Sequence, residues 1–230
     1  MHTATKRRTM VVAVLALFAM LTFVPRTALA SVCGVNGVFT KEAGELKDGD
    51  TITLYMSGKR AADESHSIFV WSNSSDANAL TVAKSQNTKI VEIVEDWTSS
   101  HNDFFICGVK PGRTTVTFKY LGKKRTINVV VKKYVNALQA IKLGKTSIRG
   151  RFKTSSYTKA AKLLKKNRGK KFTVKAKKGW RVCFKAPGYL DLKNGSKIPK
   201  DATTITVVLQ NTKDKGAIEY TVSMDRKYSM

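Results

Sequence analysis

Apolar and polar residues alternate most regularly between residues 114 and 131, and this alternation predicts a β-hairpin. One face of the hairpin is expected to carry the apolar side chains Val116, Phe118, Tyr120, Ile127, Val129 and Val131. The opposite face is expected to carry Thr115, Thr117 and Lys119. The segment Leu121-Gly122-Lys123-Lys124 supplies the turn. The pattern therefore predicts two antiparallel strands with one buried face.

The same two-residue period recurs in short runs that are separated by polar turns. The predicted strands of the first half are 51–56, 67–71, 80–83, 89–94, 104–109, 114–120 and 125–131. Many short alternating strands are typical of a β-sandwich. Trp71 ends an apolar strand, so we expect it to be a core aromatic residue.

The second half predicts a further β-rich domain with one short helix. A helix is expected at 157–166, where Tyr157, Ala160, Ala161 and Leu164 share a face. Ser155 or Ser156 is the expected cap, and Gly169 follows its end. The predicted strands are 172–176, 180–184, a hairpin of 189–193 with 196–198 that turns at Asn194-Gly195, and the pair 203–210 with 217–224.

The first thirty residues have the three parts of a secretory signal peptide. Basic Lys6-Arg7-Arg8 precedes an apolar run from Met10 to Val24, and Ala28-Leu29-Ala30 offers the small residues of a cleavage site. The apolar run is shorter than the roughly 20 residues of a membrane-spanning helix. We therefore expect cleavage after Ala30, a secreted chain and no membrane span after signal removal.

Charge divides the remaining chain into two parts. Residues 31–133 contain 14 Lys and Arg against 11 Asp and Glu, whereas residues 134–230 contain 24 against 5. The basic excess thus belongs to the C-terminal half. We expect two domains, a β-sandwich at 31–133 and a basic β-rich domain at 134–230.

Two sequence segments resemble a known family. Trp71-Ser72-Asn73-Ser74, followed by 108–118 (GVKPGRTTVTF), is similar to the group 2 bacterial immunoglobulin-like domains. That resemblance implies a β-sandwich of a secreted or surface protein, adhesins included. The second half looks like an uncharacterised β domain that trails such modules in exported proteins of Gram-positive bacteria. Residues 95–103 depart from the family pattern as an inserted loop, so Trp97 and His101 are candidate binding residues.

The chain has three cysteines, Cys33, Cys107 and Cys183, so at least one is left over if the others pair. A Cys33–Cys107 disulfide within the first domain is one alternative, since an exported chain can keep disulfides. Burial of the cysteines as small apolar residues is the other. The sequence leaves both open.

No catalytic constellation is visible, and we expect a protein that is not an enzyme. After signal removal the chain has two histidines, His66 and His101, and neither cysteine of the first domain lies in a nucleophile motif. The histidines lack the spacing of a zinc site, and Asp48-Gly49-Asp50 lacks the later ligands of a calcium loop. No phosphate-binding glycine loop follows a strand. We therefore expect no metal and no cofactor.

The basic region from Arg149 to Lys185 contains no acidic residue, and such a field attracts polyanions. The residues expected to contact a polyanion are Arg149, Arg151, Lys162, Lys165, Lys166, Arg168, Lys170, Lys171, Lys177, Lys178 and Arg181. Expected partners are anionic cell-wall polymers or host glycans. Nucleic acid is less favoured, because Phe172 and Trp180 lie in strand patterns that bury them. A solvated basic surface without a ligand is the alternative.

These patterns lead to one functional hypothesis and one alternative. The hypothesis is a secreted, non-enzymatic binding or structural protein that its basic C-terminal domain holds to anionic envelope or host glycopolymers, at the surface of a Gram-positive bacterium. The alternative is an adhesin-type module that binds a specific protein or glycan through loops of the first domain. The two differ in salt dependence, since only the first relies on charge.

Overall fold

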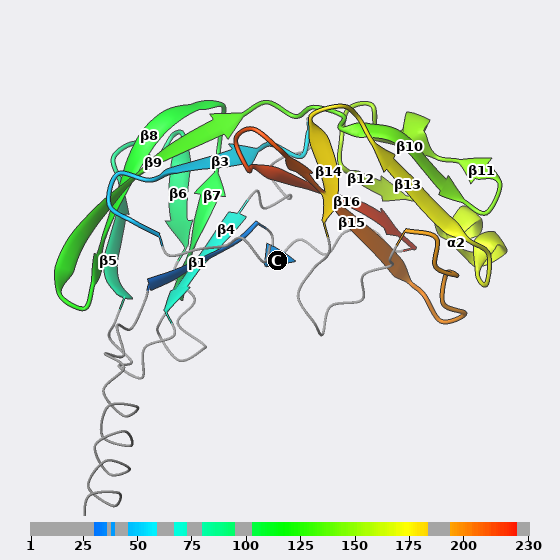
Figure 1. Cartoon of the computed structure of the whole chain (residues 1–230), viewed down its shortest axis with the longest axis horizontal. Helices are drawn as coiled ribbons and strands as arrows, with labels where there is room; N and C mark the ends of the chain where they lie inside the picture. The colour runs from blue at the N-terminus through cyan, green and yellow to red at the C-terminus, as the bar shows by residue number, and fades with distance from the viewer. Residues whose placement is uncertain are drawn as a thin grey trace, which may run out of the picture.

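The computed structural model describes residues 30–35, 38–39, 46–58, 67–72, 80–94, 103–183 and 194–224. The chain is mainly β, as the sequence predicted, and the described residues contain one α-helix. Figure 1 shows the strands in two groups, β1 to β9 and β10 to β16. We call residues 30–133 the first lobe and residues 134–224 the second lobe. In the described ranges, no helix is long and apolar enough to cross a membrane.

The first lobe consists of two sheets. The five-stranded sheet has the order β2-β1-β4-β7-β6 and contains β1 (Ala30–Val35), β2 (Val38–Phe39), β4 (Ser67–Ser72), β6 (Val91–Val94) and β7 (Asp103–Gly108). The four-stranded sheet has the order β3-β9-β8-β5 and contains β3 (Thr51–Tyr55), β5 (Leu80–Ser85), β8 (Gly112–Tyr120) and β9 (Lys123–Lys132). β3 pairs with β9 in parallel, and every other pairing in these sheets is antiparallel.

The first core lies between these sheets, and the predicted hairpin supplies one wall of it. The six apolar residues that alternate along β8 and β9 are all buried, while Lys119 is exposed. Val116 lies opposite Ile127, and Phe118 of β8 packs its ring 5.4 Å from the ring of Phe104 on β7. The predicted inward face is therefore confirmed.

The second lobe also has two sheets. The three-stranded sheet, ordered β11-β10-β13, contains β10 (Leu138–Leu143), β11 (Thr146–Ser147) and β13 (Phe172–Ala176). The four-stranded sheet, ordered β12-β16-β15-β14, contains β12 (Tyr157–Lys159), β14 (Trp180–Cys183), β15 (Thr204–Asn211) and β16 (Ala217–Ser223). The 3-10 helix η2 (Arg149–Phe152) and the helix α2 (Ala161–Asn167) connect the strands.

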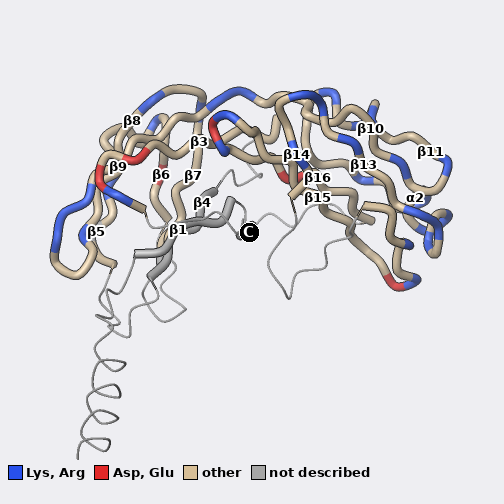
Figure 2. The backbone as a smooth tube through the Cα atoms, in the orientation of Figure 1, with Lys and Arg blue, Asp and Glu red and all other residues tan. Residues whose placement is uncertain are grey.

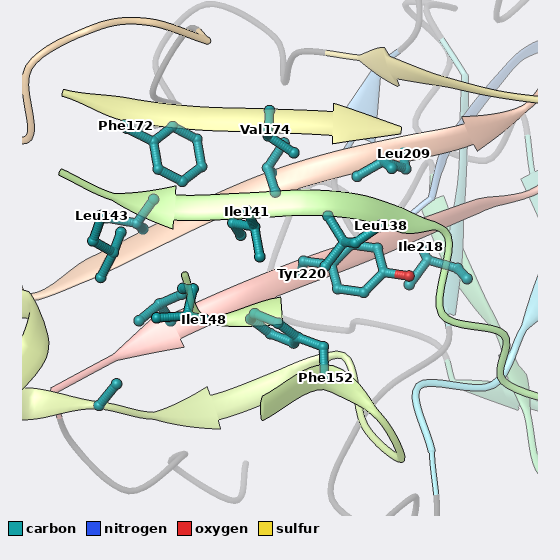
Figure 3. Close-up of a cluster of buried hydrophobic side chains, with 14 of the residues drawn as sticks. Leu138, Ile141, Leu143, Ile148, Phe152, Phe172, Val174, Leu209, Ile218 and Tyr220 are labelled. Atoms are coloured by element: carbon teal, nitrogen blue, oxygen red, sulfur yellow. The ribbon is translucent and has the colours of Figure 1, made fainter. Parts of the chain in front are cut away.

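The second core fills the space between these two sheets. Leu138, Ile141 and Leu143 of β10 are buried on the same side as Phe172 and Val174 of β13 (Figure 3). They face the four-stranded sheet, which contributes six buried core residues, Ile205, Val207, Leu209, Ile218, Tyr220 and Val222, and the partly buried Trp180 and Val182. At about 25 cal/mol per Å² of apolar surface removed from water, this burial is the main force that holds the two sheets together.

Tyr220 joins the core to the chain that enters the second lobe. Its hydroxyl accepts a hydrogen bond from Ala137 N at 2.7 Å and donates to Val135 O at 3.1 Å. Its ring packs edge-on against Phe152 at 5.4 Å. Burial raises the pKa of Tyr220 to about 12, while the hydrogen bonds with Ala137 N and with the Tyr134 side chain oppose that rise. The phenol therefore stays neutral across the physiological pH range and keeps both hydrogen bonds.

The two lobes meet around Tyr55, which ends a strand of the first lobe and belongs to the core of the second. Its ring contacts that of Trp180 edge-on at 5.1 Å. Its hydroxyl donates to Asp214 Oδ2 at 2.8 Å, and Lys132 Nζ donates to the same oxygen at 2.6 Å. Burial, and after it Asp214, raises the pKa of Tyr55 well above its ordinary value. We call these four residues the junction cluster.

Backbone contacts and one glycine continue this junction. Ser156 N donates to Ser57 O at 2.7 Å, and Gly58 forms a β-bridge with Ser155. Gly58 has a φ of +134°, and a Cβ there would lie 2.0 Å from the Thr154 carbonyl oxygen. Only glycine fits that close approach. A backbone ladder therefore connects the lobes in addition to side-chain packing.

Several predictions about the second half need correction. The predicted helix 157–166 is wrong in its first turn, because 157–159 form β12, which pairs in parallel with β16. The helix begins later, and its N-cap Ala160 makes no side-chain capping bond. Ser155 Oγ instead accepts from Tyr157 N at 3.1 Å. The strands β10 and β11 were not predicted.

The predicted hairpin at Asn194-Gly195 is described only in part. Residues 189–193 lie outside the described residues, while Asn194 and Gly195 do form a turn. After the turn, Lys197 bridges to Lys171. The segment 196–198 therefore extends the three-stranded sheet next to β13.

Gly216→Ala tests whether the junction is tightly packed. A Cβ at position 216 would lie 2.7 Å from Tyr55 Cε2 and 2.8 Å from the Thr53 carbonyl oxygen. We expect the substitution to lower the free energy of unfolding by about 1–3 kcal/mol, the usual cost of overpacking. Urea unfolding of Gly150→Ala is the matched control, because no heavy atom lies within 4 Å of a Cβ there. Equal stability of the two variants would contradict a tight junction.

Candidate polyanion interface

The predicted basic residues lie on several elements of the second lobe. Lys162, Lys165 and Lys166 are exposed on α2, and Arg149 and Arg151 are exposed on η2. Lys170 and Lys171 precede β13 and Lys177 and Lys178 follow it, and these four are exposed as well. Figure 2 shows the corresponding blue segments around β10, β13 and α2. The structure thus distributes the predicted residues over one lobe and brings only some of them onto one sheet.

The outer face of the three-stranded sheet carries lysines that alternate with buried core residues. Lys142 lies between buried Ile141 and Leu143, and Lys175 directly follows buried Val174. Because successive side chains of a strand point to opposite faces, both lysines point away from the core. Lys142 lies opposite Thr173, so it and Lys175 occupy the same face.

Lys171 and Lys197 add a directly opposed pair to this face. Phe172 N donates to Ser196 O and Ile198 N donates to Lys170 O, each at 2.8 Å. These two bonds flank the bridge between Lys171 and Lys197, so their Cα atoms are about 4.5 Å apart. We call Lys142, Lys171, Lys175 and Lys197 the lysine face. All four are exposed.

Of these four lysines, the sequence predicts Lys171 alone as a contact residue. Lys142 and Lys197 lie outside the basic region 149–185, and Lys197 belongs to the predicted hairpin at Asn194-Gly195. Lys175 lies inside the basic region but is not among the predicted contact residues. A strand prediction for 138–143 would have revealed Lys142, since its apolar neighbours alternate with polar residues.

Carboxylates are scarce around these cations. The described residues of the second lobe include three, Asp201, Asp214 and Glu219. Asp214 already bonds Lys132 and Tyr55, and Glu219 lies on β16 of the other sheet. Within the described part of the chain, the Lys132–Asp214 contact is the one ion pair that meets a 4.0 Å limit. No lysine of the lysine face is neutralised by such a pair.

Two of the predicted residues, Arg168 and Arg181, are half-buried and bonded to the fold. Arg168 donates from Nε and Nη2 to Ala202 O at 3.3 and 2.9 Å. Arg181 donates from Nε and Nη2 to Gln210 Oε1 at 3.0 and 2.7 Å. Each guanidinium therefore braces a neighbouring segment. This geometry gives Arg168 and Arg181 a structural role and does not by itself support the prediction that they contact a polyanion.

The sheet order does not support a Cys33–Cys107 disulfide. Cys33 is in β1 and Cys107 is in β7, and β4 lies between these strands. Two strand spacings amount to about 9.5 Å, whereas bonded cysteines need Cα atoms within about 7 Å. Cys107 is a free thiol in this structure. Burial, and after it the carboxylate of Glu92 on the adjacent strand, raises the pKa of Cys107 to about 11.

Several predicted features lie outside the described residues. These are the signal peptide before residue 30, the loop residues Trp97 and His101, and the side chain of Trp71. Across the described ranges, no group of three or more His, Cys, Asp or Glu side chains is placed to hold a metal ion.

Arg181→Ala is expected to destabilise the protein, because it removes two donors from the amide oxygen of Gln210, a residue only 4% exposed, and leaves that oxygen the weak thiol donor of Cys183 at 3.8 Å. An underbonded buried polar group costs about 1–3 kcal/mol. The neighbouring exposed Lys178→Ala should change the free energy of unfolding by less than about 0.5 kcal/mol. Chemical denaturation of both variants measures the difference. A similar small effect for both would show that Arg181 does not brace the fold.

The thiol of Cys107 should react slowly in the folded protein. A pKa raised from 9.0 to about 11 leaves about 100-fold less thiolate at pH 8, and the thiolate is the reactive form. The measurement is the rate of reaction with a disulfide reagent in a Cys33→Ser, Cys183→Ser variant, folded and in urea. The folded rate should still increase between pH 9 and pH 11. Equal rates in both states at pH 8 would contradict this environment.

No family model matches the chain, and no curated protein matches it. Solved structures to which it is similar include surface layer protein SbsC domains 4–9, with 11% identity, coverage of 86% of this chain and 32% of that chain, and a TM-score of 0.28. An intimin fragment in complex with the intimin-binding domain of the translocated intimin receptor has 14% identity, coverage of 75% and 60%, and a TM-score of 0.24.

A third structure is SGBP-B of the mixed-linkage glucan utilization locus of Bacteroides ovatus, in complex with a mixed-linkage heptasaccharide. It has 12% identity, coverage of 84% of this chain and 47% of that chain, and a TM-score of 0.22. This chain thus spans less than two thirds of each of these three proteins. Each TM-score is below 0.5, so the likenesses carry no argument about function.

Proposed function

We propose that the protein is a secreted, non-enzymatic binding protein that its basic domain, residues 134–230, holds to an anionic glycopolymer of the cell envelope or of a host surface. The observation that supports this most directly is the exposed basic surface of the second lobe. Between residues 134 and 183 the chain has 16 Lys and Arg and no Asp or Glu. Fourteen of these sixteen side chains are exposed, and seven of the fourteen lie on α2, η2, β10 and β13.

The physical basis of the proposed retention is counterion release. A polyanion that engages several cations at once frees the small ions that had neutralised it, which favours binding at low salt. Lysine predominates over arginine in this lobe, and lysine acts as a mobile point charge rather than a fixed fork. The expected binding is therefore strong in total, tolerant of polymer sequence and steeply salt-dependent.

The junction cluster supports a proposal in which the second lobe binds the polymer and the first lobe is held in place through its contacts with the second. Tyr55 and Lys132 come from the first lobe and bond Asp214 of the second, so the lobes are packed against each other. A basic lobe that is bound to a polymer would thereby hold the first lobe in a fixed orientation. The secretory signal at 1–30 supports an extracellular location for this role.

Co-sedimentation with purified cell walls tests the proposal, with the mature chain 31–230. Removal of the second lobe is a poor variant, since it would expose Tyr55. Instead, seven exposed lysines of the second lobe become Gln: Lys142, Lys162, Lys165, Lys166, Lys171, Lys175 and Lys197. The matched control carries the same change at seven exposed lysines of the first lobe: Lys47, Lys84, Lys89, Lys110, Lys119, Lys123 and Lys124.

We expect the unsubstituted chain and the first-lobe variant to pellet with walls at low salt, and the second-lobe variant to remain in solution. Pelleting should decrease when anionic polymers are stripped from the walls and when salt reaches about 0.15 M, where the Debye length is about 8 Å. Equal pelleting of both variants, or pelleting that persists on stripped walls and at high salt, would refute electrostatic retention and favour a specific partner of the first lobe.

A further inference from the structure

We propose that the lysine face on β10, β13 and the adjoining segment 196–198 is the docking surface for a linear phosphodiester polymer without bases. This inference rests on the proposed polyanion binding and assigns it to one sheet face and one polymer chemistry. The other exposed cations of the second lobe, on α2 and η2, are then accessory to binding.

The arrangement of these lysines is unfavourable for the sheet by itself. Lys171 and Lys197 lie directly opposite each other on neighbouring strands, and like charges in that position destabilise a sheet. No carboxylate among the described residues pairs with either one. Packing in the core does not explain the pair, because both side chains are exposed. An anion placed over the two ammonium groups would convert this repulsion into attraction.

The spacing of the four cations suits successive charges of a flexible polymer. Lys142 lies opposite Thr173, so Lys171 and Lys175 are its two diagonal neighbours at about 7–8 Å. Lys197 lies beside Lys171 at the shorter cross-strand distance of about 5 Å. Long, flexible lysine side chains can adjust by several ångströms around these positions. A flexible chain with one phosphate in each short repeat can therefore place successive charges over successive lysines.

The described residues between the four lysines offer no aromatic ring to a ligand. The residues between the lysines are small and polar or aliphatic: Gln139, Ala140, Ser147 and Thr173. No aromatic ring is among them, because Phe172 is fully buried and Trp180 packs against Tyr55. Recognition of single-stranded nucleic acid depends largely on stacking of bases against such rings. This face offers charge and hydroxyl groups, which suit a phosphate backbone alone.

The choice of cation favours loose attraction to a polymer. All four residues are lysines, whose ammonium groups bind phosphate as point charges from many directions. Arginine would be expected for bidentate recognition of individual carboxylate or phosphate groups. The arginines Arg149, Arg168 and Arg181, which lie near this sheet in sequence, donate to protein acceptors instead. The lysine face thus matches a polymer of tetrahedral, singly charged phosphodiesters.

The test compares two quadruple variants of the mature chain 31–230 in fluorescence-anisotropy titrations with labelled poly(glycerol phosphate). The first variant is Lys142→Gln, Lys171→Gln, Lys175→Gln and Lys197→Gln. The matched control changes four exposed lysines of the same lobe, Lys159→Gln, Lys162→Gln, Lys165→Gln and Lys166→Gln. Both remove the same charge, so the total field of the lobe changes equally while the site differs.

We expect the lysine-face variant to bind at least tenfold more weakly at low salt, and the control variant to lose less than threefold. The slope of log affinity against log salt should become shallower by about 3 for the lysine-face variant, at about 0.7 per phosphate contact in a single-stranded polymer. Urea unfolding should show the lysine-face variant to be at least as stable as the parent, because the Lys171–Lys197 repulsion is gone.

Three results would overturn the inference, and they are distinguishable. Equal losses for both variants would mean that binding is spread over the lobe, and the proposed polyanion retention would stand. Tighter binding of the parent to heparin or to single-stranded oligothymidylate would reject a phosphodiester polymer without bases as the ligand and would leave charge-based retention in place. Failure of the parent to bind any of the three probes at low salt would reject the proposed function itself.

Discussion

The two-residue period of the β-strand is the constraint from which both the core and the surface of the second lobe follow. Along β10, buried Ile141 and Leu143 flank exposed Lys142, and along β13, buried Val174 precedes exposed Lys175. A shift of either strand by one residue would place lysines in the core and apolar residues in water. Burial of the apolar set therefore fixes the register, and the register in turn fixes the positions of the cations.

The junction between the lobes depends on a different balance of forces. Tyr55 buries its ring in the second core, and its hydroxyl shares the carboxylate of Asp214 with Lys132. Asp214 is 19% exposed and Lys132 is 43% exposed, so solvent weakens this ion pair. The packing of Tyr55 against Trp180 and the close fit of Gly216 are consequently the stronger restraints on how the lobes are joined.

The exposed lysines of the basic surface do not stabilise the fold. Exposed lysines on an outer sheet face contribute little to stability, and an opposed pair such as Lys171 and Lys197 reduces it. In contrast, Arg168 and Arg181 each brace a carbonyl acceptor within the second lobe, which is a structural role. The charge of this lobe thus has two parts, one that maintains the fold and one that is available to a ligand.

The sequence by itself determined the β-rich character of the chain, the inward face of the β8–β9 hairpin and the basic excess of the second half. These features depend on local alternation and composition, which remain the same whatever the partner strands are. Only the tertiary structure decided that 157–159 is a strand, because its partner β16 lies about sixty residues further along the chain. The same holds for the lysine face, since Lys197 reaches Lys171 only through a bridge between distant segments. Long-range pairing leaves no local pattern in the sequence, and that is the physical reason why the four lysines could not be grouped into one site from it.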